Sequence, residues 1–207
     1  MSLLLIRHGE TALNAARVLQ PADTTLSARG IVQAQALARR LVMPPSLRIT
    51  AIISSDLPRA RRTAEAIAAA TGAPIETSAL LQERNFGDWR GLPYDGMPID
   101  PLTLAGAPPG GESAAAFEAR VAQAFALVVQ RHAALGGPLA VVTHGLVLIA
   151  MTCAHLRLTA GMTVPTHFGN TSLSIVDAMP PHAVTLLNDT AHLDTTARDD
   201  PAALSGG

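Results

Sequence analysis

Basic side chains that can bind or transfer an anionic group follow three short apolar segments of the sequence. Arg7 and His8 follow the first segment, Arg59 follows the second, and His144 follows the third. A guanidinium can hold two oxygens of a phosphoryl group at once, and a neutral imidazole has a lone pair that can attack phosphorus. Two arginines and two histidines that meet in one place would form a site for a multiply charged anion, most simply a phosphoryl group.

Neighbouring residues fit the same chemistry. Gly9 and Gly145 have no Cβ, so the backbone there can approach a bound group closely, and the helix expected after Gly145 could direct free N–H groups at an anion. Phosphoryl transfer also needs a proton for the leaving alkoxide, which a carboxylic acid with a raised pKa can supply. The sequence alone leaves Glu10, Glu83 and Glu112 open for this role.

Apolar strands and amphipathic helices alternate along the chain and must position these groups. We expect strands at 3–6, 50–54, 75–78, 139–142, 172–176 and 183–187, and helices at 27–41, 58–70, 113–135 and 146–155. This order predicts an α/β fold, a three-layer sandwich with a mainly parallel central sheet and helices on both faces. Ligands of such sheets bind outside the carboxyl ends of the strands, so the basic groups should converge on one crevice.

One domain is expected over residues 1–188, since 207 residues are few for two full domains. Within it, residues 82–112 hold most of the aromatic and turn residues and are predicted to form a long loop or short lid. From Asp189 onward the sequence is polar, small and irregular, which predicts a loosely ordered tail over 189–207. Cys153 lies in an apolar helical segment and is interpreted as a buried packing residue.

Charge and composition narrow the choice of partners. The formal net charge is −1, and all fifteen basic residues are arginine, which argues against nucleic acid or an anionic membrane surface as a partner. The single cysteine excludes an intrachain disulfide and fits a reducing compartment. The first apolar run is too short for a signal peptide, and His144 and Gly145 interrupt the longest one, at 139–156. We therefore expect a soluble, cytoplasmic protein.

The residues singled out above fall into ordered blocks. They are 7–11, 55–63, 83–91, 109–113 and 143–145, with Asn14 shortly after the first block and Asn170 near the end. In content, order and spacing these blocks resemble the histidine phosphatase superfamily, the phosphoglycerate-mutase-like proteins. The resemblance covers about residues 3–176 and implies a cofactor-independent phosphatase that passes through a phosphohistidine.

The resemblance also implies a role for each matching residue. His8 would be the phosphorylated nucleophile, and Glu83 the proton donor and later the base. The phosphate pocket would be formed by Arg7, Arg59 and His144, with His144 protonated. The residues that face the substrate would be Asn14, Gln20, Gly145 and Asn170. No metal or other cofactor is expected, because His-x-x-x-His is absent and two guanidiniums would repel a dication.

Departures from the family pattern concern the rim of the site. Pro21 and Arg90 stand where the family often has glycine and glutamate, which affects substrate preference rather than chemistry. The segment before 109–113 is shorter than in the mutases and rich in proline, which favours the compact phosphatase branch, similar to α-ribazole phosphatase and broad-specificity enzymes. We therefore expect hydrolysis of a small phosphorylated metabolite, with a mutase or a non-catalytic phospho-ligand binder as alternatives. The resemblance also leads us to expect a homodimer.

Overall fold

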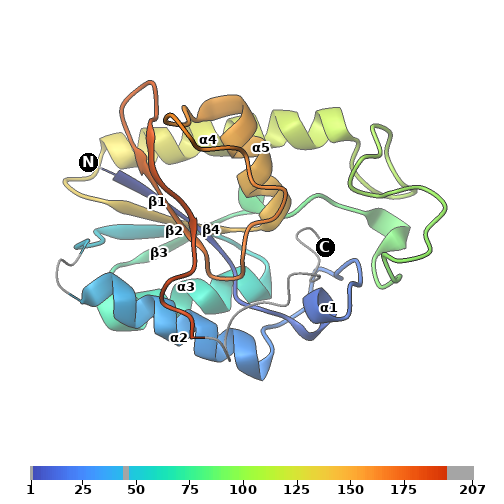
Figure 1. The fold of residues 1–207 in the computed structure, drawn as a ribbon, viewed down its shortest axis with the longest axis horizontal. Helices are drawn as coiled ribbons and strands as arrows, with labels where there is room; N and C mark the ends of the chain where they lie inside the picture. Colours follow the sequence, from blue (N-terminus) through green and yellow to red (C-terminus); the bar gives the residue numbers. More distant parts are fainter. Residues whose placement is uncertain (1, 44–46, 195–207) are drawn as a thin grey trace.

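A six-stranded sheet forms the middle layer of the structure, a computed structural model that describes residues 2–43 and 47–194 (Figure 1). The strands are β1 (Ser2–Arg7), β2 (Ala51–Ser55), β3 (Ile75–Ser78), β4 (Leu139–Thr143), β5 (Leu173–Asp177) and β6 (Val184–Asp189). Their order is β3-β2-β4-β1-β5-β6. The first four strands of this order pair in parallel, and β5 and β6 are antiparallel. The predicted α/β fold with a mainly parallel sheet is confirmed.

Helices cover both faces of the sheet. They are α1 (Ala12–Ala15), α2 (Ala28–Val42), α3 (Pro58–Thr71), α4 (Ala114–Ala133) and α5 (Gly145–His155), with short 3-10 turns η1 (Ala79–Leu81) and η2 (Gly87–Trp89). Helices α2 and α3 lie on one face, and α4 and α5 on the other (Figure 1). No helix in the described part of the chain is long and apolar enough to cross a membrane.

The side chains of the central strand β1 explain why the sheet lies between two layers of helices. Successive side chains of a strand point to opposite faces. Leu4 and Ile6 accordingly join the core under α2 and α3, whereas Leu3 and Leu5 join the core under α4 and α5. All four are at most 1% exposed. An unbroken apolar run is therefore what a strand between two helical layers requires.

Local contacts define several helix ends. The Ser27 side chain accepts a hydrogen bond from Gly30 N–H and caps α2, and Ser113 caps α4 in the same way. Gly72 ends α3 with φ 73°, in the left-handed region that suits glycine. Helix α1 could not be predicted, because a helix of four residues is too short to show an apolar period.

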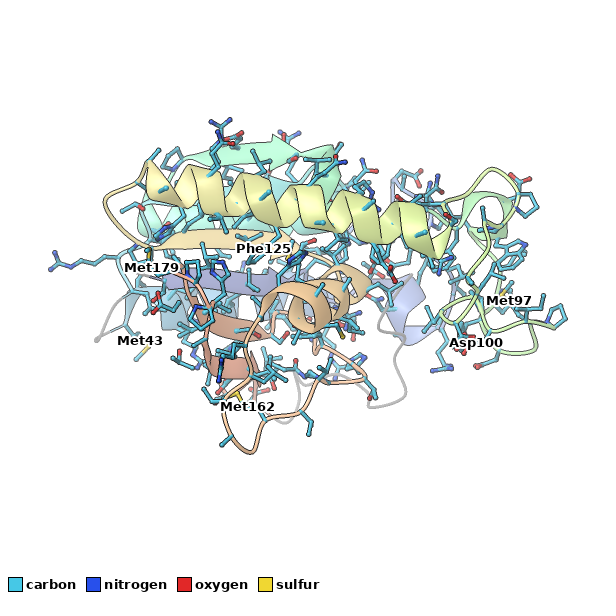
Figure 2. The ribbon with its side chains drawn as sticks, turned by 90° about the horizontal axis from the view of Figure 1, so that it is seen from above. Met43, Met97, Asp100, Phe125, Met162 and Met179 are labelled. Carbon is cyan, nitrogen blue, oxygen red and sulfur yellow. The ribbon has the colours of Figure 1, made fainter. Side chains whose placement is uncertain are left out.

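The segment over 82–112 lies at the end of the molecule toward which β1 runs (Figure 1). Its only regular element, within this fully described stretch, is η2. Figure 2 shows Met97 and Asp100 of this segment beyond the N-terminal end of α4, while Met43 and Met179 lie at the opposite end of the molecule. The segment is therefore placed beside the carboxyl ends of the parallel strands, and we call it the lid.

Two expectations differ from the structure. Asp189 ends β6 and pairs with Arg40, and Leu193 is 3% exposed, so the chain remains packed up to residue 194. The predicted tail therefore does not begin at 189, and its remainder, 195–207, lies outside the described residues. Cys153 is exposed rather than buried. Met151 and Thr152 lie on the buried face of α5, and Cys153, the next residue, lies on its outer face.

Candidate active site

The loops that follow the parallel strands bring the predicted catalytic side chains together in one buried cluster. Its members are Arg7 at the end of β1, His8 just after it, Arg59 in the first turn of α3, Glu83 after η1, and His144 before α5. Each is at most 3% exposed. The ring centroids of the two histidines lie 5.0 Å apart. The basic residues predicted to converge at the strand ends are therefore neighbours in space.

His8 is held in an orientation that leaves one ring nitrogen available. Its Nδ1 lies 2.7 Å from the carbonyl oxygen of Gly9. Because a carbonyl can only accept, Nδ1 carries the proton and Nε2 keeps the lone pair. Burial lowers the pKa of His8 well below the ordinary value, and the charges of Arg59 and Arg7 lower it further. The imidazole is thus neutral at pH 7, as a nucleophile must be.

His144 is also neutral in the protein without a ligand, whereas the protonated ring expected from the sequence belongs to the state with a bound phosphoryl group. Its pKa lies well below the ordinary value because of burial first and the charge of Arg59 second. Its Nε2 lies 2.8 Å from the hydroxyl of Ser55, at the end of β2. A bound phosphoryl dianion would favour the protonated ring, so protonation of His144 is tied to the presence of an anion.

Glu83 is a carboxyl group whose surroundings favour the acid form. Its two oxygens accept hydrogen bonds from the backbone N–H groups of Arg84 (3.0 Å) and Leu146 (3.1 Å). Burial raises the pKa of Glu83, while these two hydrogen bonds and the charge of Arg59 act against the rise. Leu146 lies in the first turn of α5, so this helix end directs an N–H at Glu83, where the sequence analysis expected an external anion.

The two other acidic candidates serve the frame of the protein. Glu10 accepts a hydrogen bond of 2.8 Å from the Ser27 hydroxyl, and its other oxygen lies 3.3 Å from an Arg29 nitrogen. Glu112 is bound by two nitrogens of Arg120, at 2.9 and 2.7 Å. Both of these carboxylates are thus bound by arginine side chains, which favours Glu83 as the candidate for the acid.

The two pocket arginines are anchored by backbone carbonyls. Arg7 donates to the carbonyl of Phe168, and Arg59 Nη1 lies 3.4 Å from the carbonyl oxygen of Pro21. Burial lowers the pKa of Arg59 to about 10, an effect that the charge of Glu83 opposes and the charge of Arg90 reinforces. Arg59 remains protonated at neutral pH and can bind an anion.

Residues predicted to face the substrate lie in the loops that hold the cluster. Asn14 forms a capping box with Thr11 at the start of α1, and Gln20 accepts a hydrogen bond of 2.7 Å from the Thr11 hydroxyl. Asn170 donates to the carbonyl of His8 at 2.9 Å. Gly145 is the buried first residue of α5. The contacts of Asn14, Gln20 and Asn170 with their loops explain their burial, and contact with a substrate stays a prediction.

Gly9 is needed for packing inside the protein. A Cβ at this position would lie 2.6 Å from the carbonyl oxygen of Gly30 in α2. The N–H of Gly9 donates to the Thr63 hydroxyl of α3 at 3.0 Å. The loop after β1 therefore packs closely against α2 and α3. These contacts fix the backbone next to His8.

Two arginines that the sequence analysis did not single out organise the acid and the lid. Arg120 donates to the carbonyls of Gln82 (2.7 Å) and Glu83 (3.3 Å) while it binds Glu112. Arg84 donates to several lid carbonyls, among them Leu104 at 2.6 Å. No sequence signal identifies such residues, because their partners are mainly backbone oxygens, which every residue has.

The described residues contain no group of three or more histidine, cysteine, aspartate or glutamate side chains that could hold a metal ion. The fold and the site define a class of protein: an α/β domain with a neutral histidine, two buried guanidiniums and a buried carboxylic acid at the carboxyl edge of its sheet. This arrangement is suited to phosphoryl transfer.

Comparison with known proteins identifies the family within this class. The sequence pattern of the histidine phosphatase superfamily (branch 1) matches residues 3–190. The chain therefore belongs to the histidine phosphatase superfamily, as its sequence blocks predict, and the expectation of a phosphatase is confirmed at this level.

Individual relatives differ in their named activities. A probable phosphoglycerate mutase GpmB from Citrobacter koseri is 33% identical, over 97% of this chain and 98% of the relative. The structure of a mycobacterial glucosyl-3-phosphoglycerate phosphatase is 31% identical with a TM-score of 0.70, over 84% of this chain and 90% of that one. A phosphoserine phosphatase from Entamoeba histolytica is 26% identical with a TM-score of 0.74, over 93% and 99% of the two chains.

Proposed function

We propose that this protein hydrolyses small phosphomonoesters without a metal or organic cofactor, through a phosphohistidine at His8. The observation that carries the proposal is the state of His8, a neutral imidazole whose Nε2 is left free by the Nδ1 contact with Gly9. The charges of Arg59 and Arg7 act on this ring and also on the buried acid Glu83, and phosphoryl transfer depends chiefly on such fixed charges.

In the first step, Nε2 of His8 forms a bond to phosphorus while the bond from phosphorus to the ester oxygen breaks. The guanidiniums of Arg7 and Arg59 bind the equatorial phosphoryl oxygens, together with His144 once the anion has raised its pKa. Glu83 gives its proton to the leaving alkoxide. The raised pKa of Glu83 supports this role, since the acid must still be protonated when substrate binds.

In the second step, the Glu83 carboxylate takes a proton from water, and the hydroxide so formed attacks phosphorus. The bond between phosphorus and His8 Nε2 breaks, inorganic phosphate leaves, and His8 and Glu83 return to their starting protonation states. The same residue thus acts as acid and then as base, as reversible proton transfer allows. The backbone contacts of Arg84 and Leu146 with the carboxylate would hold it in place through both steps.

Transfer to water rather than to a second hydroxyl is supported by the lid. Leu92 and Ile99 are 45% and 52% exposed, so the lid leaves apolar side chains in solvent. A lid of this kind closes weakly over an intermediate, and water can reach the phosphoryl group. In the presence of 3-phosphoglycerate, we expect product analysis to show free phosphate; accumulation of an isomeric phosphoglycerate would favour a mutase instead.

Arg90 supports a preference for substrates with a second negative charge. Its side chain is half-buried and makes no hydrogen bond or ion pair with the described residues. The adjacent Gly91 donates to the carbonyl of Leu19 at 2.6 Å, which places Arg90 beside the loop whose Pro21 contacts Arg59. Burial lowers the pKa of Arg90. The charge of Glu112 acts against this shift, and a carboxylate next to the phosphate would supply the direct contact that this guanidinium lacks.

Matched substrate pairs test this preference. We expect 3-phosphoglycerate and phosphoserine to show a lower KM than glycerol 3-phosphate and phosphoethanolamine, by about 10-fold, the value of one charged contact. Arg90→Ala should remove the difference and leave kcat unchanged. Arg61→Ala is the control, since Arg61 pairs with Glu65 on the surface of α3. Equal KM values within each pair for the wild type would contradict the preference.

A further inference from the structure

A strained turn lies directly behind the nucleophile. Thr171 has φ 56°, a left-handed conformation that a β-branched residue rarely adopts. Its backbone N–H donates to the carbonyl of His8 at 3.3 Å, and the side-chain nitrogen of Asn170 donates to the same oxygen at 2.9 Å. The turn therefore fixes the peptide group next to the His8 side chain. Because the turn is strained, it needs contacts that stabilise it.

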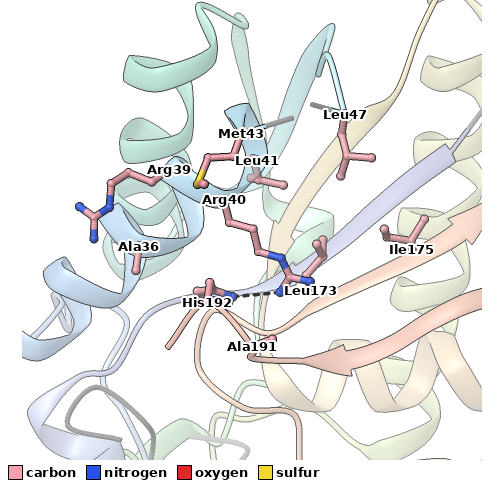
Figure 3. Close-up of a pocket in the computed structure, with 10 residues that line it drawn as sticks. All are labelled: Ala36, Arg39, Arg40, Leu41, Met43, Leu47, Leu173, Ile175, Ala191 and His192. Carbon is pink, nitrogen blue, oxygen red and sulfur yellow. Dashed lines mark hydrogen bonds between the residues drawn. The ribbon is translucent and has the colours of Figure 1, made fainter. Parts of the chain in front are cut away.

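The support comes from the segment that follows β6. His192 Nε2 lies 3.0 Å from the hydroxyl of Thr171, and His192 Nδ1 lies 3.2 Å from Arg40 Nη1 of α2. Figure 3 shows Arg40 extending along the cavity wall to the His192 ring. The same Arg40 nitrogen lies 2.7 Å from an Asp189 carboxylate oxygen. Helix α2 and the end of β6 thus fix the ring from one side.

The hydrogen bonds that join Arg40, His192 and Thr171 have only one consistent arrangement of donors and acceptors. Arginine can only donate, so His192 Nδ1 accepts and His192 Nε2 carries the proton. Nε2–H then donates to the Thr171 hydroxyl, whose own hydrogen points to the carbonyl of Asn170, 2.7 Å away. Burial and then the charge of Arg40 lower the pKa of His192 to about 4, which keeps the ring in this neutral form at neutral pH.

We infer that His192 is a positioning residue for His8, acting through Thr171 and the turn at 170–172. The inference rests on the proposed function of His8. Hydrogen bonds rather than close packing determine the ring position, since a cavity of about 620 Å³ lies beside it, lined by Arg40, Leu173 and other residues. The contacts of the segment over 189–194 thereby extend from α2 to the peptide group of the nucleophile.

Single-turnover and steady-state kinetics on the whole chain test the inference. We expect His192→Ala to lower kcat and the rate of His8 phosphorylation about 10- to 100-fold with KM unchanged, because small misplacements of a reacting group have effects of this size. His192→Gln keeps one donor and one acceptor and should restore part of the rate. His182→Ala, in the turn at the opposite end of the β5–β6 hairpin, is the matched control.

A second variant keeps the test decisive where His192→Ala fails to fold. Glycine tolerates φ 56°, so Thr171→Gly removes the hydroxyl and relieves the strain at once. We expect Thr171→Gly to keep the wild-type melting temperature and lose kcat as His192→Ala does. Wild-type kcat in Thr171→Gly would overturn the inference. The proposed function is tested separately, since it requires His8→Ala to be inactive whatever the result at Thr171.

Discussion

His8 and His144 are neighbouring imidazoles whose ring centroids lie 5.0 Å apart, yet their ring nitrogens make different contacts. The Nδ1 of His8 contacts a backbone carbonyl, which leaves Nε2 as a base, whereas the Nε2 of His144 contacts the Ser55 hydroxyl. Burial keeps both rings neutral in the absence of an anion. These contacts support the proposed attack by His8, and the proposed anion binding by His144 requires its ring to become protonated.

Glu83→Gln tests the acid at the residue scale. Glutamine cannot release a proton, so we expect kcat for alkyl phosphates to fall by about 10²- to 10⁴-fold, the usual contribution of general acid catalysis. The loss should be smaller for p-nitrophenyl phosphate, because nitrophenolate leaves without a proton. Glu112→Gln is the control for a nearby carboxylate bound to Arg120. Equal losses of kcat/KM, which reports the first step alone, on both kinds of substrate would contradict the role of Glu83 as the acid of that step.

The pH dependence of kcat/KM follows from the same two groups. His8 must be neutral, and its pKa lies below 6.5 because of burial, so the acidic limb should lie below pH 6.5. Glu83 must be protonated, and burial raises its pKa above 4.5, so the alkaline limb should lie above pH 4.5 and report Glu83. Profiles of kcat/KM for the wild type and Glu83→Gln check this. An alkaline limb that survives unchanged in the variant would belong to another group.

The sequence identified some site residues more readily than others. His8, Arg59 and His144 follow apolar strands, so the topology of a parallel sheet alone brings them together. Glu83 lies in a loop with no such signal, and only the family resemblance separated it from Glu10 and Glu112. The protonation state of His144 could not be predicted, because it depends on burial and on the positions of charges in space.

At the scale of elements, close contact between the loop after β1 and helix α2 fixes the nucleophile. A Cβ on Gly30 would lie 2.0 Å from the carbonyl oxygen of Glu10. Gly30→Ala should therefore lower the free energy of unfolding by about 1–3 kcal/mol, as overpacking does, and lower activity as well. Gly136→Ala has open space around the new Cβ and is the control for denaturant unfolding. Equal stability of both variants would contradict the close packing.

Arg120 links α4 to the segment that carries Glu83. It binds Glu112 and donates to the carbonyls of residues 80, 82 and 83. We expect Arg120→Lys to lower kcat with little change in KM, because an ammonium group cannot make this planar set of contacts. Arg131→Lys is the control, since Arg131 forms an exposed pair with Glu76. Steady-state kinetics at a temperature where both variants are folded would decide, and wild-type kcat in Arg120→Lys would contradict the role.

Element positions were predictable where the hydrophobic period was long. Strands β1 and β4 and helix α3 lie within two residues of their predicted bounds, because buried strands and amphipathic helices leave strong patterns. The segment after Asp189 was predicted poorly, because its order depends on partners far away in the sequence, Arg40 and Thr171. Polar composition alone does not reveal such contacts.

At the scale of the whole molecule, the sheet and its four main helices form the frame, and the lid lies beside the carboxyl ends of the parallel strands. The frame could be predicted from alternating strands and helices. The path of the lid could not, because it depends on hydrogen bonds from Arg84 to backbone carbonyls between 101 and 112. The homodimer and the cytoplasmic location stay predictions, and sedimentation and cell fractionation test them.

The most direct test of the central claim is hydrolysis of p-nitrophenyl phosphate in the presence of EDTA, by the wild type and by His8→Ala. A phosphohistidine mechanism predicts that the wild type is active without metal and that the variant is inactive, since His8 Nε2 is the proposed acceptor of the phosphoryl group. His182→Ala should keep wild-type activity. A wild-type rate in His8→Ala, or loss of wild-type activity in EDTA, would contradict the account.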